Sequence, residues 1–308
     1  MSLQFIIEEE QVGERIDKFL SDALHDLSRS YIQKLIKDGQ VTVNQKIIKA
    51  NYKLNVGDML ELDEPELKEP DIVAEDIPLD ILYEDADLLV INKPKGMVVH
   101  PSAGHYSGTL VNALMYYCKD DLSGINGVMR PGIVHRIDMD TTGSLVVCKN
   151  DFAHNEIAEQ LKVHSITRVY HAIVHGVLKD DEGTIDAPIG RHLIDRKKMS
   201  INHKNGKEAV THYKVLQRFS NYTYIECRLE TGRTHQIRVH MASIGHPLLG
   251  DTVYGPVKSV AKLQGQTLHA KTIGIQHPRT RESLEINAPL PEYFINLLKK
   301  LENNLHLS

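Results

Sequence analysis

The sequence contains no tryptophan and only three cysteines among its 308 residues. Cys118, Cys148 and Cys227 are too few and too scattered for a disulfide framework or a thiolate metal cage. Long apolar runs are missing too, because no uninterrupted run approaches the roughly 18 residues of a membrane span. The first residues are acidic where a signal peptide needs basic ones. We therefore expect a cytoplasmic protein with no membrane contact.

Basic residues are in the minority, with 36 Lys and Arg against 41 Asp and Glu and a formal net charge of −5 at pH 7. This average argues against a polyanionic partner. The charges are segregated, however, because residues 61–87 hold twelve acids and one base, which leaves the rest of the chain at +6. Prolines fall in the same stretch, so we interpret residues 66–78 as an acidic linker between a domain of residues 1–65 and one of residues 79–308.

The N-terminal part has the periodicity of a small αβ module. Apolar spacing predicts helices over residues 15–24 and 28–37, and Gly39 is placed to end the second one. A tight hairpin is predicted around Asn44-Gln45, followed by a strand pair with Gly57-Asp58 at its turn. From Arg29 to Lys53 the module carries a net charge of +5.

The order of residues in this module resembles the αL-type RNA-binding domain of a small-subunit ribosomal protein and of several RNA-modifying enzymes. The resemblance covers roughly residues 14 to 62. It implies that the second helix offers polar and basic side chains to RNA phosphates, namely Arg29, Ser30, Gln33, Lys34 and Lys37. The alternative is that these charges form only a solvated face.

The large domain alternates segments typical of strands and of helices. Buried strands are expected at LLVINK and SLVVCKN, and long strands with period-two alternation at ITRVYHAIVHG, EAVTHYKVLQRF and YTYIECRLE. Helices are expected at TLVNALMYYCK, FAHNEIAEQLK, RTHQIRVHMASIG and PEYFINLLKKL. This pattern predicts an α+β protein with a mixed, mostly antiparallel sheet.

The densest group of unusual residues is RPGIVHRIDMDTTGSLVVCKN, residues 130–150. We expect a strand that runs into His135-Arg136-Ile137-Asp138, then a loop closed by Gly143, then a second strand. A carboxylate on such a loop, presented by rigid strands, is a candidate catalytic group. The alternatives are a loop-capping aspartate, or a glycosidase pair with Asp140, which the turn-forming Asp140-Thr141-Thr142-Gly143 disfavours.

Two further segments add basic residues and histidines. INKPKGMVVHPSAG, residues 91–104, is expected to be a strand that ends in a turn carrying Lys93. LETGRTHQIRVHMASIGHPLLGDTVYG, residues 229–255, is expected to open a helix on which His235 and Arg238 share one face. On residue type alone, we favour the interpretation of His235 and His240 as helix histidines with satisfied hydrogen bonds.

Taken together, HRIDMDTTG, KPKGMVVHP, RVYHAIVHG, LETGRTHQIRVHMASIGHPLLGD and LHAKTIGIQHP closely resemble the motifs of the RluA-type ribosomal large-subunit pseudouridine synthases. The αL-type domain in front is the arrangement of that family's D-type member. The resemblance implies the pseudouridine synthase fold, with a mixed, mostly antiparallel central sheet flanked by helices and loops. It also implies isomerisation of uridine to pseudouridine in 23S ribosomal RNA.

The resemblance assigns roles position by position. Asp138 matches the catalytic aspartate, Tyr170 the tyrosine that packs on the target base, and Arg238 the basic partner of the aspartate. Arg136 matches the arginine that enters the RNA when the target nucleotide is flipped out. Further RNA contacts are expected from His135, Arg233, His235 and Lys93.

The implied reaction explains these residue types. It breaks the N1–C1′ bond of uridine and rejoins the base through C5 without redox change, so no cofactor, nucleotide or metal is expected. An ionised carboxylate attacks C1′ or removes a proton from C2′, and a guanidinium at hydrogen-bond distance keeps it anionic. The base must leave the stack first, at a cost of a few kcal/mol.

The expected partner is 23S ribosomal RNA or an assembling large ribosomal subunit, bound by a monomer. Residues 190–240 have a net charge of +7 and contain what we interpret as a basic hairpin. A metal hydrolase is disfavoured, because His171 and His175 on a strand would lie about 13 Å apart. The remaining alternatives are a non-catalytic RNA-binding or ribosome-assembly factor, and a pseudouridine synthase for another RNA such as tRNA.

Overall fold

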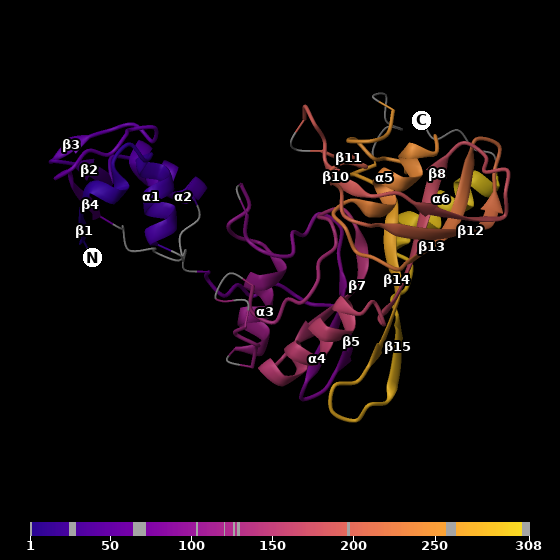
Figure 1. The fold of residues 1–308 in the computed structure, drawn as a ribbon. Coiled ribbons are helices and arrows are strands. Elements are labelled where there is room, and N and C mark those ends of the chain that lie inside the picture. Colours follow the sequence, from indigo (N-terminus) through magenta and orange to yellow (C-terminus); the bar gives the residue numbers. More distant parts are fainter. Residues whose placement is uncertain are drawn as a thin grey trace. The chain divides into compact units, whose positions relative to one another are not determined.

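The computed structural model describes residues 2–24, 29–63, 72–102, 104–119, 121–125, 127, 130–195, 198–256 and 263–303 (Figure 1). The chain divides into two compact units, Met1–Glu69 and Pro70–Ser308. Within the described ranges, no helix combines the length and apolar character that crossing a membrane requires.

The first unit is a four-stranded antiparallel sheet packed against two helices. Its elements are β1 (Ser2–Ile6), a short 3-10 helix (Glu9–Gln11), α1 (Ile16–Ala23), α2 (Arg29–Lys37), β2 (Val41–Val43), β3 (Lys46–Ile47) and β4 (Met59–Asp63). The sheet order is β1-β4-β2-β3. The predicted helices and hairpin are confirmed, with Asn44 and Gln45 at positive φ in the turn and Gly39 at φ +77° after α2.

The strand pair predicted around Gly57-Asp58 is wrong. Residues 54–58 form a turn, and β4 pairs with the distant strands β1 and β2. The buried carboxylate of Asp58 fixes this turn by accepting hydrogen bonds from the Asn55 backbone N–H, the Tyr52 hydroxyl and the Asn44 amide. The turn also bonds to the segment just after β1, because the Gly57 N–H donates to the Ile7 carbonyl and the Ile7 N–H donates to the Asp58 carbonyl.

Part of the predicted linker belongs to the second unit. Ile72 is buried in the core of that unit. The Glu75 backbone N–H donates to the Asn112 carbonyl, and the Asn112 side chain donates to the Val73 carbonyl. Residues 72–78 therefore pack against a helix, in contrast to the prediction, while residues 66–71 lie outside the described residues.

The second unit is built on a nine-stranded sheet. Its strands are β5 (Ile81–Glu84), β6 (Leu88–Lys93), β7 (Thr142–Cys148), β8 (Thr167–His175), β9 (Glu182–Asp186), β12 (Val210–Arg218), β13 (Tyr222–Leu229), β14 (Leu268–Gln276) and β15 (Ser283–Asn287). The order is β5-β6-β7-β14-β8-β13-β12-β9, with β15 also paired to β14. Among the described strands, only β7 and β14 pair in parallel, so the predicted mixed, mostly antiparallel sheet is confirmed.

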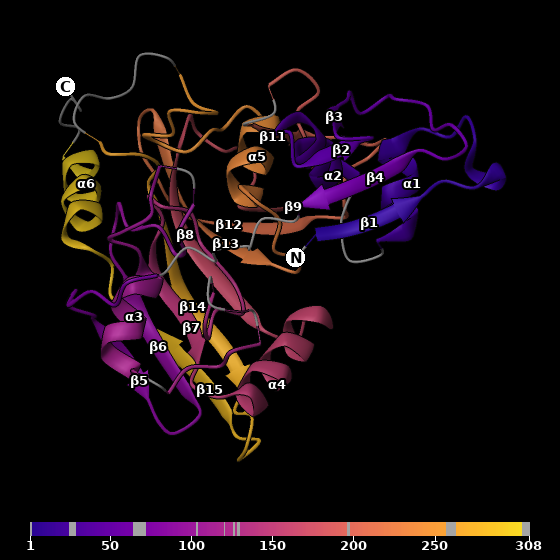
Figure 2. The ribbon, with the colours of Figure 1, turned by 90° about the vertical axis from the view of Figure 1, so that its left-hand side faces the viewer.

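Helices cover both faces of this sheet (Figure 2). They are α3 (Leu110–Cys118), α4 (Asp151–Lys162), α5 (Gln236–Ser243) and α6 (Glu292–Glu302), and a separate hairpin is formed by β10 (Ile189–Arg191) and β11 (Met199–Ile201). Along β6, alternate residues pack on α3 and on α4, because successive side chains of a strand point to opposite faces. Alternate residues of β8 likewise pack against α5 on one face of the sheet and against α6 on the other.

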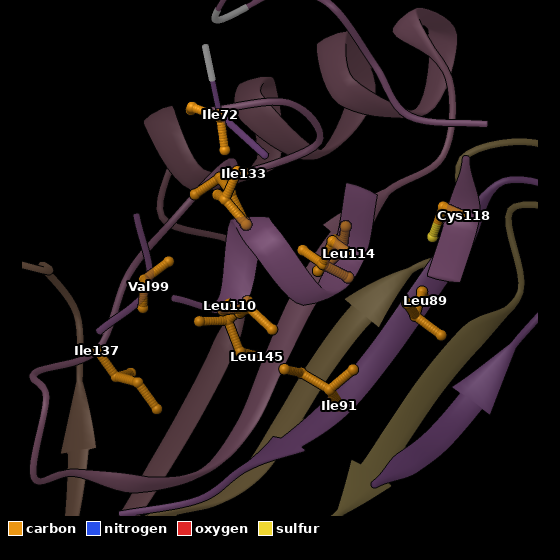
Figure 3. Packing of buried hydrophobic residues seen from close by; sticks show 12 residues of the cluster. Ile72, Leu89, Ile91, Val99, Leu110, Leu114, Cys118, Ile133, Ile137 and Leu145 are labelled. Carbon is orange, nitrogen blue, oxygen red and sulfur yellow. The ribbon is translucent and has the colours of Figure 1, made fainter. Parts of the chain in front are cut away.

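The α3 core reaches the segment that carries the candidate aspartate. Figure 3 shows Leu110 of α3 beside Leu145 of β7, with Ile137 in the same cluster. Tyr170 packs against this cluster and also against the α5 cluster. Asp138 and Tyr170 therefore lie where two hydrophobic cores meet on one face of the sheet.

Candidate active site

Asp138 is the first residue of a tight turn. Its carbonyl accepts the Thr141 backbone N–H at 3.0 Å, and β7 begins one residue later. The strand predicted to lead into Asp138 is not formed, because residues before it make only an isolated bridge between Ile133 and Val147. Gly143, expected in the loop, lies inside β7 at φ +107°, where a Cβ atom would come within 2.2 Å of the Ala270 carbonyl oxygen.

Lys93 ties the turn after β6 to the Asp138 turn. Its ammonium donates to the carbonyls of Pro94, Met97 and Met139 at 2.8, 2.8 and 2.9 Å. The Gly96 backbone N–H donates to the same Met139 carbonyl. The side chain is buried and these bonds use all three N–H donors of the ammonium. The predicted RNA contact of Lys93 is therefore wrong, and the residue supports the loop that carries Asp138.

Arg238 of α5 joins two carboxylates. Its Nη1 donates to Oδ2 of Asp138 at 2.9 Å, while Nε and Nη2 donate to the two oxygens of Asp251 at 2.7 and 3.0 Å. Burial acts to lower the pKa of Arg238, but the hydrogen bonds and charge of Asp251, helped by Asp138, raise it above its ordinary value. The guanidinium is thus permanently charged and held in one orientation.

His235 lies on the other side of the Asp138 carboxylate. Its Nε2 is 3.8 Å from Oδ1 of Asp138, and its Nδ1 is 2.8 Å from the Tyr254 hydroxyl. That hydroxyl also accepts the Met199 backbone N–H of β11. Burial lowers the pKa of His235, with the charge of Asp138 acting against it. The residue sits just before α5 at φ +56°, so the prediction that it lies within the helix is wrong.

Asp138, His235 and Arg238 line a pocket whose walls are partly apolar. It is formed by Arg136, Ile137, Asp138, Thr141, Tyr170, Leu229, Arg233, His235, Gln236, Ile237, Arg238 and Leu268. The Asp138 side chain is 21% exposed and the Arg238 side chain 6%, so the carboxylate faces the opening and its partner lies behind it. Burial raises the pKa of Tyr170 to about 12, which keeps its phenol protonated at neutral pH.

Two arginines extend this pocket. Arg136 is exposed, and its Nη1 lies 3.5 Å from Nε2 of His100. Burial, with the charges of Arg136 and Arg130, lowers the pKa of His100 to about 4, so its ring is neutral beside the guanidinium. Arg233 donates from Nε to the Glu208 carbonyl. The pocket therefore combines a carboxylate that a guanidinium orients, a flat aromatic wall and two cationic side chains.

Comparison with known proteins identifies the protein family in which this pocket occurs. The family model described as RNA pseudouridylate synthase matches residues 87–243, and the S4 domain model matches residues 14–60. The chain belongs to the RNA pseudouridine synthases.

Relatives match over nearly the whole chain. An uncharacterized RNA pseudouridine synthase of Bacillus subtilis is 56% identical, covering 96% of this chain and 97% of that protein. The ribosomal large subunit pseudouridine synthase D of Zymomonas mobilis is 46% identical, with 97% of each chain covered. The structure of human RNA pseudouridylate synthase domain containing 1 is 25% identical, with a TM-score of 0.58, and covers 74% of this chain and 96% of that one. The predicted family and fold are confirmed, and the protein is an RNA-modifying isomerase.

The S4 domain of this pseudouridine synthase carries the predicted basic helix. Arg29, Ser30, Gln33, Lys34 and Lys37 are all exposed on α2. Arg29 and Gln33 also donate to the buried carboxylate of Asp17, at 3.1 and 2.6 Å. Burial acts to raise the pKa of Asp17, but hydrogen bonds from Arg15, Gln33 and Arg29 lower it well below its usual range. Asp17 therefore orients part of this face.

Three histidines have roles inside the synthase domain. The ring Nε2 of His135 accepts the Val146 backbone N–H, and burial lowers its pKa to about 4. This neutral ring braces β7 through one of its two nitrogens, and the RNA contact expected of His135 stays a prediction. His240 contacts the Thr211 hydroxyl and the Ala187 carbonyl, as expected of a satisfied helix histidine. His171 contacts the Tyr224 hydroxyl, and the described residues contain no group of three or more His, Cys, Asp or Glu suited to a metal ion.

Asp251 and Tyr254 are site residues that the sequence did not indicate. Asp251 also accepts the backbone N–H groups of Val253 and Tyr254, so one carboxylate holds both the loop and Arg238. The Tyr254 ring lies against Arg238, with the guanidinium carbon 5.2 Å from its centroid. Both residues fall in the motif around GHPLLGD, but only the path of the loop after α5 brings them back to the helix.

Proposed function

We propose that this enzyme converts uridine to pseudouridine at defined positions of 23S ribosomal RNA in the large ribosomal subunit. The observation that carries the reaction is the Asp138–Arg238 ion pair, 2.9 Å long, beside Tyr170 in one pocket. The choice of RNA is supported by relatives named ribosomal large subunit pseudouridine synthase D. Those of Zymomonas mobilis and Pseudomonas aeruginosa share 46% and 45% identity over at least 95% of this chain.

Asp138 acts on the sugar of the target nucleotide. The N1–C1′ bond breaks, the uracil turns, and C5 bonds to C1′; C5 loses a proton and N1 gains one, so atoms and electrons balance. Asp138 promotes this by bonding to C1′ or by removing the C2′ proton, and both routes need an ionised carboxylate. Because Arg238 holds Oδ2, we assign Oδ1 as the reacting oxygen.

Tyr170 and Arg136 prepare the substrate for this step. The C1′ atom is inaccessible while the uridine is stacked, so the nucleotide must be extruded at a cost of a few kcal/mol. Tyr170 offers an aromatic face on which the uracil stacks, and stacking on an aromatic ring contributes about 1–3 kcal/mol. Arg136, exposed at the pocket, enters the space that the base leaves.

The remaining polar residues hold the RNA. Arg233 and His235 contact it at the pocket, and α2 of the S4 domain contacts phosphates through Arg29, Ser30, Gln33, Lys34 and Lys37. Phosphate contacts position a protein on RNA without reading its sequence. The S4 domain thus increases affinity, and the pocket determines which base reacts.

The decisive experiment is tritium release from RNA labelled at C5 of uridine. Unmodified 23S RNA and a pool of unmodified tRNA are incubated in parallel with the enzyme, and the modified positions are then mapped. We expect release from the 23S RNA alone. Release from tRNA alone would assign the enzyme to that RNA, and no release from an RNA that it binds would contradict the proposed activity.

A further inference from the structure

A second pocket adjoins the catalytic one and is strongly cationic. The two share Arg136, Tyr170, Leu229 and Arg233. Arg168 and two histidines complete the polar lining, to which no acidic residue in the described part of the chain contributes. Three guanidinium groups thus surround one space next to the wall on which the uracil is proposed to stack.

Arg168 is the unusual member of this group. It lies on β8 two residues before Tyr170, so both side chains point to the same face of the sheet. The residue is only 8% exposed. Its Nη2 donates to the Glu230 carbonyl at 2.8 Å, but its Nε is buried with no hydrogen-bond partner among the described residues.

A buried cation of this kind is costly to maintain. Taking a charge out of water without an opposite charge nearby destabilises a folded protein. Arg238, which is buried to a similar extent, is paired with Asp138 and Asp251. Arg168 forms no ion pair with any described carboxylate. The positive charge of the second pocket is therefore not neutralised by the described residues, and an anionic ligand would neutralise it.

We propose that the second pocket binds a backbone phosphate of the RNA next to the flipped uridine, with Arg168 as its buried ligand. This inference rests on the proposed function. A phosphate is the anion that the substrate carries, and the planar fork of a guanidinium matches its oxygens. Because Tyr170 lines both pockets, a phosphate in the second belongs to the nucleotide that enters the first or to its neighbour.

The glycine at position 232 makes room for this arrangement. A Cβ atom added there would lie 2.5 Å from Nη1 of Arg168, and the φ angle of Gly232 is one that alanine also adopts. Gly232→Ala therefore displaces the guanidinium without removing its charge. It tests the position of Arg168, whereas Arg168→Gln tests its charge.

The first experiment measures RNA binding over a range of salt concentrations for Arg168→Gln and Gly232→Ala. Arg281→Gln, at an exposed arginine between β14 and β15, and Gly124→Ala, with open space at its Cβ, are the controls. We expect both test variants to bind about tenfold more weakly or worse. The slope of log K against log salt should fall by about 1 for Arg168→Gln. The controls should match the wild type.

Thermal unfolding without RNA separates binding from folding. If Arg168 is retained for the ligand, Arg168→Gln is at least as stable as the wild type, because it removes an unpaired buried charge. A less stable variant with unchanged RNA affinity would show that Arg168 supports only the fold and would overturn the proposal.

The second experiment locates the phosphate. Single phosphates flanking a mapped target uridine are replaced by neutral methylphosphonates, one per RNA. One replacement should weaken binding by the wild type about tenfold and leave the affinity of Arg168→Gln unchanged. If every replacement weakens both proteins equally, the pocket binds no phosphate. Binding is read without turnover, so an RNA that is bound in this way but never isomerised would contradict the activity and not the pocket.

Discussion

The two oxygens of the Asp138 carboxylate have different surroundings: Arg238 holds Oδ2, and Oδ1 lies 3.8 Å from the His235 ring. Asp138→Asn keeps the shape and removes the charge. We expect RNA binding to persist and turnover to fall by a factor of at least about 1,000, as is typical when a nucleophile is removed. Tritium release and filter binding measure the two effects.

Asp140→Asn is the matched control, because Asp140 lies in the same turn and is the second acid of the glycosidase alternative. It should retain most of the turnover. An inactive Asp140→Asn alongside a partly active Asp138→Asn would transfer the catalytic role to Asp140.

Asp251 affects the reaction through Arg238. Asp251→Asn leaves the buried guanidinium with one carboxylate in place of two, so it is less well fixed. We expect kcat to fall about 10- to 100-fold with KM nearly unchanged, the range seen when an outer-shell partner is lost. Stability should fall by about 3 kcal/mol in urea unfolding, because a buried pair is broken. A rise in KM with kcat unchanged would show that Asp251 serves binding instead.

Asp87 connects several elements. It lies in the turn between β5 and β6, and its carboxylate accepts hydrogen bonds from Arg279, between β14 and β15, and from Asn150, which caps α4. The Arg279 hydrogen bond, opposed by burial and helped by Asn150, lowers the pKa of Asp87 to about 2. Because the folded-state pKa is depressed, this stabilisation is complete above the unfolded value near 4 and is lost as the pH falls from 4 to 2.

Asp87→Asn should therefore be less stable than the wild type at pH 6, by about 1 kcal/mol once solvent exposure of Arg279 is considered. The difference should shrink as the pH falls from 4 to 2. Urea unfolding of both proteins at pH 6, 4 and 2.5 measures it, and a difference that does not change with pH would mean that the Asp87 charge contributes nothing.

Helices and strands followed from periodicity, because each has one or two faces that must be buried. The helix of residues 236–243 was predicted, but its first residue was not, since His235 adopts a left-handed conformation that residue type does not reveal. The sequence does not predict the pairing of β1 with β4, because the two strands are far apart in sequence. In the site, Asp138, Tyr170 and Arg238 were found from their motifs, whereas the role of Asp251 and the burial of Lys93 depend on how loops pack.

At the scale of the whole molecule, the net charge of −5 is a sum over two compact units, for which we propose different roles: RNA affinity for the first and the reaction for the second. Each unit has its own hydrophobic core, so removing Met1–Glu69 should leave the synthase domain folded. We expect the shortened protein to bind RNA more weakly, with a salt slope smaller by up to about 3 if Arg29, Lys34 and Lys37 contact phosphates.

Circular dichroism and salt-dependent binding measure this outcome. The full-length double variant Lys34→Gln and Lys37→Gln is the comparison that keeps the S4 domain folded. An unchanged slope in both proteins would mean that the basic face of α2 is only solvated.

The position of β14 also determines when this enzyme becomes complete during synthesis. The strand comes late in the sequence, yet it lies between β7 and β8 and joins them into one sheet. Until the ribosome has released residues 268–276, both neighbours present open edges, and the start of β7, next to the Asp138 turn, lacks its pairing with β14. A growing chain is therefore exposed to edge pairing with other chains. The central sheet that carries the site is therefore complete only after residues 268–276 have been translated.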